Sequence, residues 1–265
     1  MSAATTPETA TAPALATRPS NATAAVLRTE ARLFAREPMS VFWIVLFPPL
    51  LLLVMGAVPR FREASADLGG QSLVDVYTPV VVLLAMIMAA VNAMPPVLLG
   101  YREAGVLRRL RTTPLDPALL LLSQVLLHAA AVLVSVTLTL VTARVVFSVP
   151  LPGSPGGYAV ALLLTLGATV AVGALITALA PNPRTGVVLS MAAFFPLMFT
   201  SGVYFPVQAM SGTLRAVVER TPLGAGVQAL NDATLGAFPD LTDLAVTGGW
   251  AAVLGLLAVV AVRRG

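Results

Sequence analysis

The chain has 265 residues, of which 57% are hydrophobic and only 11% charged, with a formal net charge of +4. An ordinary soluble domain is about 45–50% apolar and about 25% charged. The balance therefore excludes a typical soluble enzyme and an intrinsically disordered chain, and it predicts a membrane protein. The chain also has no cysteine, which excludes disulfide frameworks, Cys-ligated zinc and iron–sulfur clusters.

The first 23 residues form an Ala/Thr/Pro tract with one arginine and one glutamate. The tract lacks a positive region followed by an apolar core, so it does not have the pattern of a signal peptide. It has too few apolar residues to bury, and we expect a disordered cytoplasmic tail over residues 1–23. Residues 24–265 are expected to form a single six-span transmembrane domain.

Residues 24–37 predict an amphipathic helix ahead of the first apolar run. Arginines recur at every fourth position and form one cationic stripe, beside a neighbouring apolar face. Such a helix suits the cytoplasmic leaflet, with arginine toward anionic headgroups and apolar side chains in the acyl boundary. The alternative is that these arginines only form the positively charged flank that cytoplasmic ends of transmembrane segments commonly have. The stripe consists of Arg28, Arg32 and Arg36, and the apolar face of Leu27, Ala31 and Phe34.

Six apolar runs follow, each near the ~20 residues that cross a bilayer. None contains arginine, aspartate or glutamate, as a transmembrane segment requires, because a charge at the bilayer centre costs about 2.5–3.5 kcal/mol. No amphipathic helix stands ready to cover the runs, which argues against the buried helices of a large soluble core. The predicted spans are residues 41–58, 78–99, 118–143, 157–180, 186–205 and 244–262.

Arginine counts give the orientation. With the N-terminus inside, the inner segments carry 11 arginines and the outer segments 5, which together are all 16 basic residues. Cytoplasmic loops carry the excess of basic residues. We therefore expect a multi-pass plasma-membrane protein with both termini in the cytoplasm.

The outer stretch between the last two spans, residues 206–243, is too long for a structureless loop. Prolines divide it into two short pieces, residues 210–221 and 223–236. We expect two short helices that lie at the outer interface or dip into it.

The third span carries a polar stripe. Its members fall within about 60° of one another at 100° per residue, so they should avoid lipid. Hydrogen bonds between helices, about 0.6–1.7 kcal/mol each, are one interpretation. Substrate contact or proton handling by His128 is the other, and a single histidine without a carboxylate partner makes a poor relay. The stripe consists of Gln124, His128, Ser135, Thr139 and Thr142.

The fifth span carries Phe194, Phe195, Met198 and Phe199. Aromatic and methionine side chains make an adaptable surface suited to amphiphilic cargo, although packing or contact with lipid would place them there too. Asn92, a lone polar residue of the second span, has the same two interpretations.

The short loop between spans 2 and 3 is densely charged and bounded by prolines. Tyr101–Leu115 resembles the E-x-G-x-L-x-x-L-R-x-T-P-L signature of type 2 ABC transporter permeases, and the nearest branch looks like daunorubicin-type drug-resistance exporters. The stretches 201–206 and 214–222 continue the resemblance. The residues that carry the resemblance are Glu103, Gly105, Leu107, Arg109, Leu110, Arg111, Thr113, Pro114 and Leu115.

The resemblance implies an all-α membrane fold of six transmembrane helices with an elbow helix, a cytoplasmic coupling helix and outer re-entrant helices. It implies two copies, or a related partner, around a path for a hydrophobic drug, antibiotic or lipid-like cargo. A separate ATP-binding subunit would hold ATP and Mg²⁺ and press on the coupling helix. The residues implied in that contact are Tyr101, Arg102, Glu103, Gly105, Leu107, Arg108, Arg109, Leu110 and Arg111.

The residues themselves fit a subunit that hydrolyses nothing. All basic residues are arginine, so the chain cannot contain a GxxxxGK phosphate-binding loop. We expect no catalytic residue, cofactor, metal or nucleic acid on this chain. A membrane-embedded enzyme is an alternative that needs clustered Asp, Glu or His at the interface. A secondary transporter is another, and it would want carboxylates within the spans.

Overall fold

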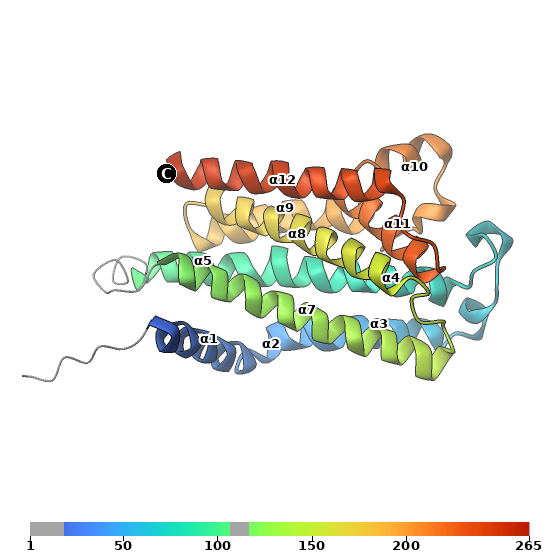
Figure 1. Cartoon of the computed structure of the whole chain (residues 1–265), viewed down its shortest axis with the longest axis horizontal. Helices are drawn as coiled ribbons and strands as arrows, with labels where there is room; N and C mark the ends of the chain where they lie inside the picture. The colour runs from blue at the N-terminus through green and yellow to red at the C-terminus, as the bar shows by residue number, and fades with distance from the viewer. Residues whose placement is uncertain (1–18, 107–116, 265) are drawn as a thin grey trace, which may run out of the picture.

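The structure is a computed structural model that describes residues 19–106 and 117–264. Within those ranges the chain is helical apart from its connections, and its one β-pairing is an isolated bridge between Ala64 and Ser72. Figure 1 shows the long helices lying side by side in an elongated bundle, with the connections gathered at its two ends.

The first half of the bundle begins with α1 (Pro19–Ala35) and α2 (Pro38–Val41). A π-helical turn, η1 (Phe42–Leu46), joins α2 to α3 (Phe47–Gly56). The short 3₁₀ turns η2 (Pro59–Arg62) and η3 (Ala66–Leu68) then lead to α4 (Leu73–Ile87). A second π-helical turn, η4 (Met88–Ala93), joins α4 to α5 (Met94–Glu103).

The second half contains α7 (Pro117–Phe147), α8 (Pro155–Leu179) and α9 (Pro183–Thr200). The 3₁₀ turn η5 (Val207–Ala209) precedes the short helices α10 (Gly212–Val218) and α11 (Pro222–Thr234). The last helix is α12 (Leu241–Arg264). Proline stands at the first helical position of α8, α9 and α11, where its missing N–H leaves no helical bond unmade.

Among the described residues, five helical segments are long and apolar enough to cross a membrane: Pro38–Gly56, Leu73–Glu103, Leu119–Phe147, Pro155–Leu179 and Leu241–Arg263. Each overlaps one predicted run, so five of the six predicted runs lie in helices that are candidates for crossing the membrane. The remaining run, residues 186–205, overlaps α9, which starts with Pro183 and Arg184 and ends at Thr200, so the helix stops five residues before the predicted end of the span. This helix packs against α5 and α8 within the bundle.

The connections between the long helices gather at the two ends of the bundle. One end gathers α1, the last turn of α5, the tight turn between α8 and α9, and the C-terminus, and we call it the inner end. The other gathers residues 57–72, 148–154 and 201–240, and we call it the outer end (Figure 1). The assignment of the inner end to the cytoplasm is a prediction from the sequence.

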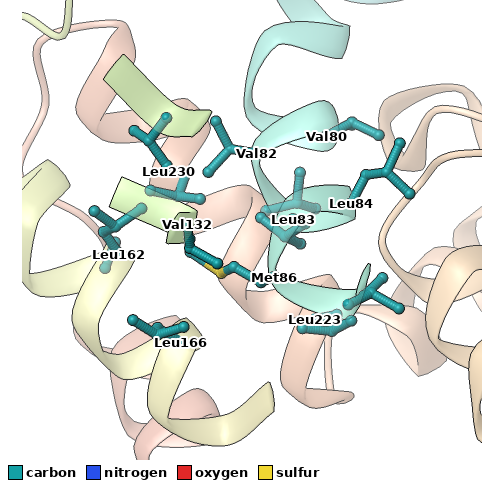
Figure 2. Packing of buried hydrophobic residues seen from close by; sticks show 14 of the residues in the cluster. Val80, Val82, Leu83, Leu84, Met86, Val132, Leu162, Leu166, Leu223 and Leu230 are labelled. Atoms are coloured by element: carbon teal, nitrogen blue, oxygen red, sulfur yellow. The ribbon is translucent and has the colours of Figure 1, made fainter. Parts of the chain in front are cut away.

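The centre of the bundle is α4. Of the most apolar window of Leu73–Glu103, 83% is buried, against 11% for Leu241–Arg263, so α4 is central and α12 peripheral. Figure 2 shows α4 side chains packed against α7, α8 and α11. Dispersion contacts of this kind are small individually and large in sum. The labelled residues are Val80, Val82, Leu83, Leu84, Met86, Val132, Leu162, Leu166, Leu223 and Leu230.

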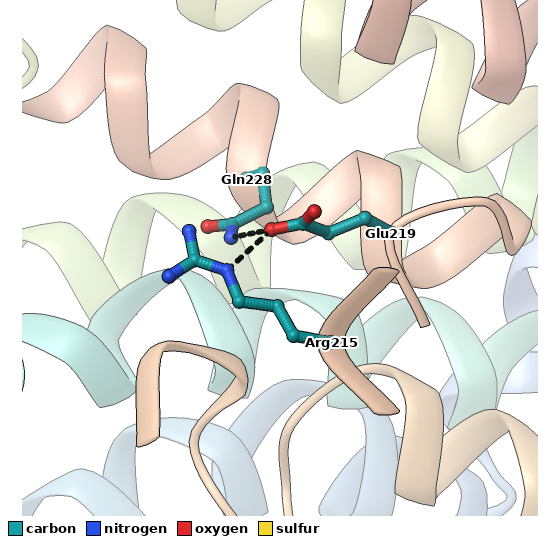
Figure 3. A network of polar contacts seen from close by, with 3 residues as sticks. All are labelled: Arg215, Glu219 and Gln228. Carbon is teal, nitrogen blue, oxygen red and sulfur yellow. Dashed lines mark hydrogen bonds and ion pairs between the residues drawn. The ribbon is translucent and has the colours of Figure 1, made fainter. Parts of the chain in front are cut away.

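The two predicted outer helices are confirmed as α10 and α11, with shorter bounds. α10 is exposed except for Val218, whereas α11 is buried along almost its whole length against α8, α12 and α4. A polar network joins the two helices (Figure 3): the carboxylate Oε1 of Glu219 accepts from Arg215 Nε at 2.6 Å and from Gln228 Nε2 at 3.0 Å. The outer end is therefore closed by a packed helix instead of a loose loop.

The predicted disordered tail, residues 1–23, extends too far toward the C-terminus. α1 begins at Pro19, so residues 19–23 belong to the amphipathic helix. Proline at the first position and the helix formers from Ala22 onward extend the helix beyond its charged stripe. Residues 1–18 lie outside the described residues.

Candidate functional site

The helix α1 presents a charged residue to the bundle. Its arginines Arg28, Arg32 and Arg36 are exposed, as the stripe predicted, and Leu27 and Phe34 are half-buried. Between those two apolar residues lies Glu30, only 7% exposed. Positions three and four apart share a helix face. The face that the sequence marked as apolar thus carries a carboxylate at its middle.

The Glu30 carboxylate is bound by donors from two other helices. Its Oε2 accepts from the Tyr101 hydroxyl of α5 at 2.7 Å and from Nε2 of Gln124 of α7. A buried carboxylate without partners is costly, and hydrogen bonds to an ionised acceptor are stronger than neutral ones. We call Glu30, Tyr101 and Gln124 the inner polar cluster. It fastens α1, α5 and α7 together at the inner end.

His128 lies one turn further along α7, next to this cluster. Its Nδ1 is 2.9 Å from the carbonyl oxygen of Gln124, and its ring meets the Phe34 ring edge-on with centroids 5.5 Å apart. The side chain is 2% exposed. His128 thus packs between α7 and α1, and its hydrogen bond stays within α7 instead of joining two helices.

The last turn of α5 holds the residues that the coupling motif singled out. Arg102 Nη1 donates to the carbonyl of Ala180 at 3.5 Å, just past the last residue of α8. A basic group is favourable at this place because the C-terminus of a helix carries partial negative charge. Glu103 is exposed. Gly105 has a φ of +69°, a left-handed conformation that ends helices and favours glycine. The motif's glycine therefore turns the chain out of α5.

Other predicted coupling residues lie outside the described residues. They are Leu107, Arg108, Arg109, Leu110 and Arg111. The described part shows what precedes them: α5 is tied to α1 and α7 through Tyr101 and to α8 through Arg102. A displacement of the segment after Gly105 would reach four helices through these two side chains.

The outer part of the α7 stripe behaves differently from its inner part. Ser135 and Thr139 are 0% exposed, and their hydroxyls have no hydrogen-bond partner among the described residues. Thr142 is half-buried. The predicted bond between helices is thus made by Gln124, while Ser135 and Thr139 are buried without one.

The remaining residues of the expected path do not join this site. Phe195 and Phe199 of α9 are 61% and 38% exposed on the flank of the bundle. Asn92 lies in η4, where its Nδ2 donates to Sδ of Met88 at 3.7 Å within the same turn. Across the described ranges there is also no group of three or more His, Cys, Asp or Glu side chains placed to hold a metal ion.

Sequence reasoning missed Glu30, which it counted only as a charge of the inner flank. The available signal was its position, three residues after Leu27 and four before Phe34, on the apolar face. Its partners are 71 and 94 residues away in the chain, and no local pattern indicates them.

Comparison with known proteins identifies the bundle. The family model described as ABC-2 type transporter matches residues 21–235, which covers α1 to α11 and more than half of the chain. No significant match was found among curated proteins. The chain therefore belongs to the ABC-2 type transporter family and is the membrane component of an ABC-type transporter.

Proposed function

We propose that the chain forms the path of an exporter that a separate ATP-binding subunit drives, and that the driving force enters at the last turn of α5. The inner polar cluster carries this proposal. Tyr101 lies two residues before the exposed Glu103 and bonds to Glu30 of α1. A push on the segment after Gly105 is thereby passed to the elbow helix and to α7 instead of being absorbed by a flexible loop.

The proposed orientation places the inner end in the bacterial cytoplasm. The 11 arginines of the inner segments support it, since basic residues stay on the cytoplasmic side. In this orientation the exposed arginines of α1 lie at the anionic leaflet and Glu103 faces the ATP-binding subunit. The outer helices α10 and α11 then close the exit, and cargo leaves when they part.

We propose a hydrophobic or amphiphilic cargo, such as a drug or antibiotic, and a second copy of the chain or a related permease across the path. The exposed flank of α9 supports both. Apart from Arg184 near its inner end, the exposed side of this helix is apolar, so contact with lipid would suit it too. The flank presents Met191, Phe195 and Phe199, large adaptable side chains that a facing subunit or a greasy cargo would cover.

The test of coupling is a charge reversal at each end of the bundle. Glu103→Lys places a cation in the proposed contact, and Glu63→Lys makes the same change at an exposed residue of the outer end. We expect Glu103→Lys to weaken co-purification with the Walker-motif ATPase about tenfold or more, equivalent to about 1.4 kcal/mol. Equal effects of the two reversals would refute entry of the force at α5.

The test of the second copy uses the absence of native cysteine. Phe195→Cys should give a disulfide-linked dimer in membranes under mild oxidation. Leu256→Cys, at a residue 66% exposed on α12, should stay monomeric. Cross-linking at residue 256 and none at 195 would move the facing surface from α9 to α12.

A further inference from the structure

Two of the candidate spans contain the same unusual backbone feature, a π-helical turn followed at once by a pair of prolines. In the first, η1 precedes Phe47, Pro48 and Pro49, and in the second, η4 precedes Met94, Pro95 and Pro96. The amide N–H of Phe47 bonds to the carbonyl of Phe42, and that of Met94 to Ala89. Both bonds span five residues, which defines the wider π turn.

The prolines leave each turn short of backbone bonds. Proline has no N–H, so the carbonyls five residues before each one lose their donor. These are the carbonyls of Trp43 and Ile44 in the first span and of Ala90 and Val91 in the second. Sharp helix bends occur at prolines and at π-bulges, and each of these two spans has a π turn next to a pair of prolines. Bending at these turns breaks fewer hydrogen bonds than bending elsewhere in the spans.

The two turns lie together in the bundle. η1 contacts η4, and both contact α7. α7 is α-helical over 31 residues, with its single proline at the first position. The two spans interrupted by π turns therefore lie beside the continuous helix α7, with their π turns next to each other along the bundle. On the inner side of these turns, α2 leads back to α1 and α5 leads to Tyr101, which the inner polar cluster holds together.

The packing around η4 accommodates an unpaired carbonyl. A Cβ atom on Gly173 of α8 would lie 1.9 Å from the carbonyl oxygen of Ala90, so the α8 backbone reaches this oxygen only because the residue is glycine. Ala89, Ala90 and Val91 are at most 1% exposed. The α8 backbone at Gly173 covers this carbonyl and keeps it from lipid.

We infer that η1 and η4 form one paired hinge, about which α1, α2 and α5 tilt as a unit relative to α3 and α4. The hinge depends on the proposed function at one point: the ATP-binding subunit supplies the force that tilts these helices. The inner polar cluster makes the inner segments move together, and α7, which is bound to the cluster through Gln124, follows as one unbroken helix. The residues that define the hinge are Phe42–Leu46, Pro48, Pro49, Met88–Ala93, Pro95 and Pro96.

Spin-label distances on the cysteine-free chain test the hinge without an ATPase. One pair of labels, at Met39 and Val54, spans η1, and both residues are well exposed, 71% and 68%. The control pair, at Leu122 and Val145, lies on α7, with 52% and 74% exposed. In nanodiscs we expect a distance distribution at least about twofold broader for the pair across η1. Equal widths would overturn the hinge, and this comparison needs no altered backbone.

Proline substitutions give the matched experiment. P48A/P49A restores two N–H donors, so it should narrow the Met39–Val54 distribution to that of the α7 pair. Pro79→Ala changes another buried proline, inside α4 and away from a π turn, and should leave both widths unchanged. An equal narrowing by Pro79→Ala would overturn the specific role of the paired prolines.

The same label pairs in the complex with the ATP-binding subunit separate the hinge from the proposed function. ATP should shift the Met39–Val54 distance and leave the Leu122–Val145 distance in place, and P48A/P49A should abolish that shift. A broad distribution that ATP does not move would keep the hinge and refute the ATP-driven push. A shift of the α7 pair equal to that across η1 would overturn the hinge itself.

Discussion

The inner polar cluster makes a quantitative prediction for Tyr101→Phe. The substitution removes only the hydroxyl, which donates to the Glu30 carboxylate at 2.7 Å, while the carboxylate stays 7% exposed. Hydrogen bonds to charged groups contribute about 1.5–3 kcal/mol. Because Gln124 still donates to the same oxygen, we expect the lower value, about 1.5 kcal/mol. For a chain of this size that corresponds to a fall in Tm of about 3–6 °C.

The assay is thermal unfolding in micelles, followed by the fluorescence of the chain's two tryptophans. Tyr204→Phe removes the hydroxyl of a tyrosine that is 52% exposed and serves as the control, with a Tm within about 1 °C of the parent. Tyr101→Phe combined with Gln124→Leu should cost more than the two single changes together, because Glu30 then keeps no donor from the cluster. A Tm for Tyr101→Phe equal to that of Tyr204→Phe would refute the cluster as a fastening between helices.

Three further outcomes follow from the geometry. Gly173→Ala should destabilise the fold by about 1–3 kcal/mol through overpacking on Ala90. Gly167→Ala, in open space on the same helix, should not destabilise it. Equal Tm values for the two variants would contradict the close approach of Gly173 to the Ala90 carbonyl. Gly105→Ala should introduce about 1–2 kcal/mol of local backbone strain, because residue 105 has a φ of +69°. Gly100→Ala, at a helical position with open space, should be neutral. The rates of proteolysis of the two variants in the segment after α5 measure the difference in local stability. Burial, with the charge of Asp240 adding, raises the pKa of Asp232, so its ionisation disfavours the folded state and stability falls as pH rises through the carboxyl range. Asp232→Asn should therefore raise Tm at pH 7 and lose that advantage at about pH 4 and below, and a Tm gain that does not change with pH would contradict the assignment.

The spans could be predicted from the sequence because the bilayer imposes a simple rule, an uncharged apolar run of sufficient length. The rule located five candidate spans and α9, which begins with Pro183 and Arg184. Proline positions likewise predicted α10 and α11, since proline ends one helix and starts the next. These features depend on neighbouring residues alone.

The π turns and the inner polar cluster could not be predicted in this way. An apolar run gives no periodic signal that separates a π turn from an α turn, although the prolines after Phe47 and Met94 marked both places. The burial of Glu30 depends on partners from α5 and α7, which only the packed bundle brings together. The sequence pattern of α1 indicated its apolar face, and tertiary contacts decided that a carboxylate belongs there.

ATP-driven export is tested by transport in proteoliposomes that contain the chain together with an ATP-binding subunit. A fluorescent amphiphile should move across the membrane only when ATP is supplied on the side of the inner end. Omission of the ATP-binding subunit, or Glu103→Lys in this chain, should abolish the movement. Transport by the chain alone under an ion gradient, without ATP, would contradict the account.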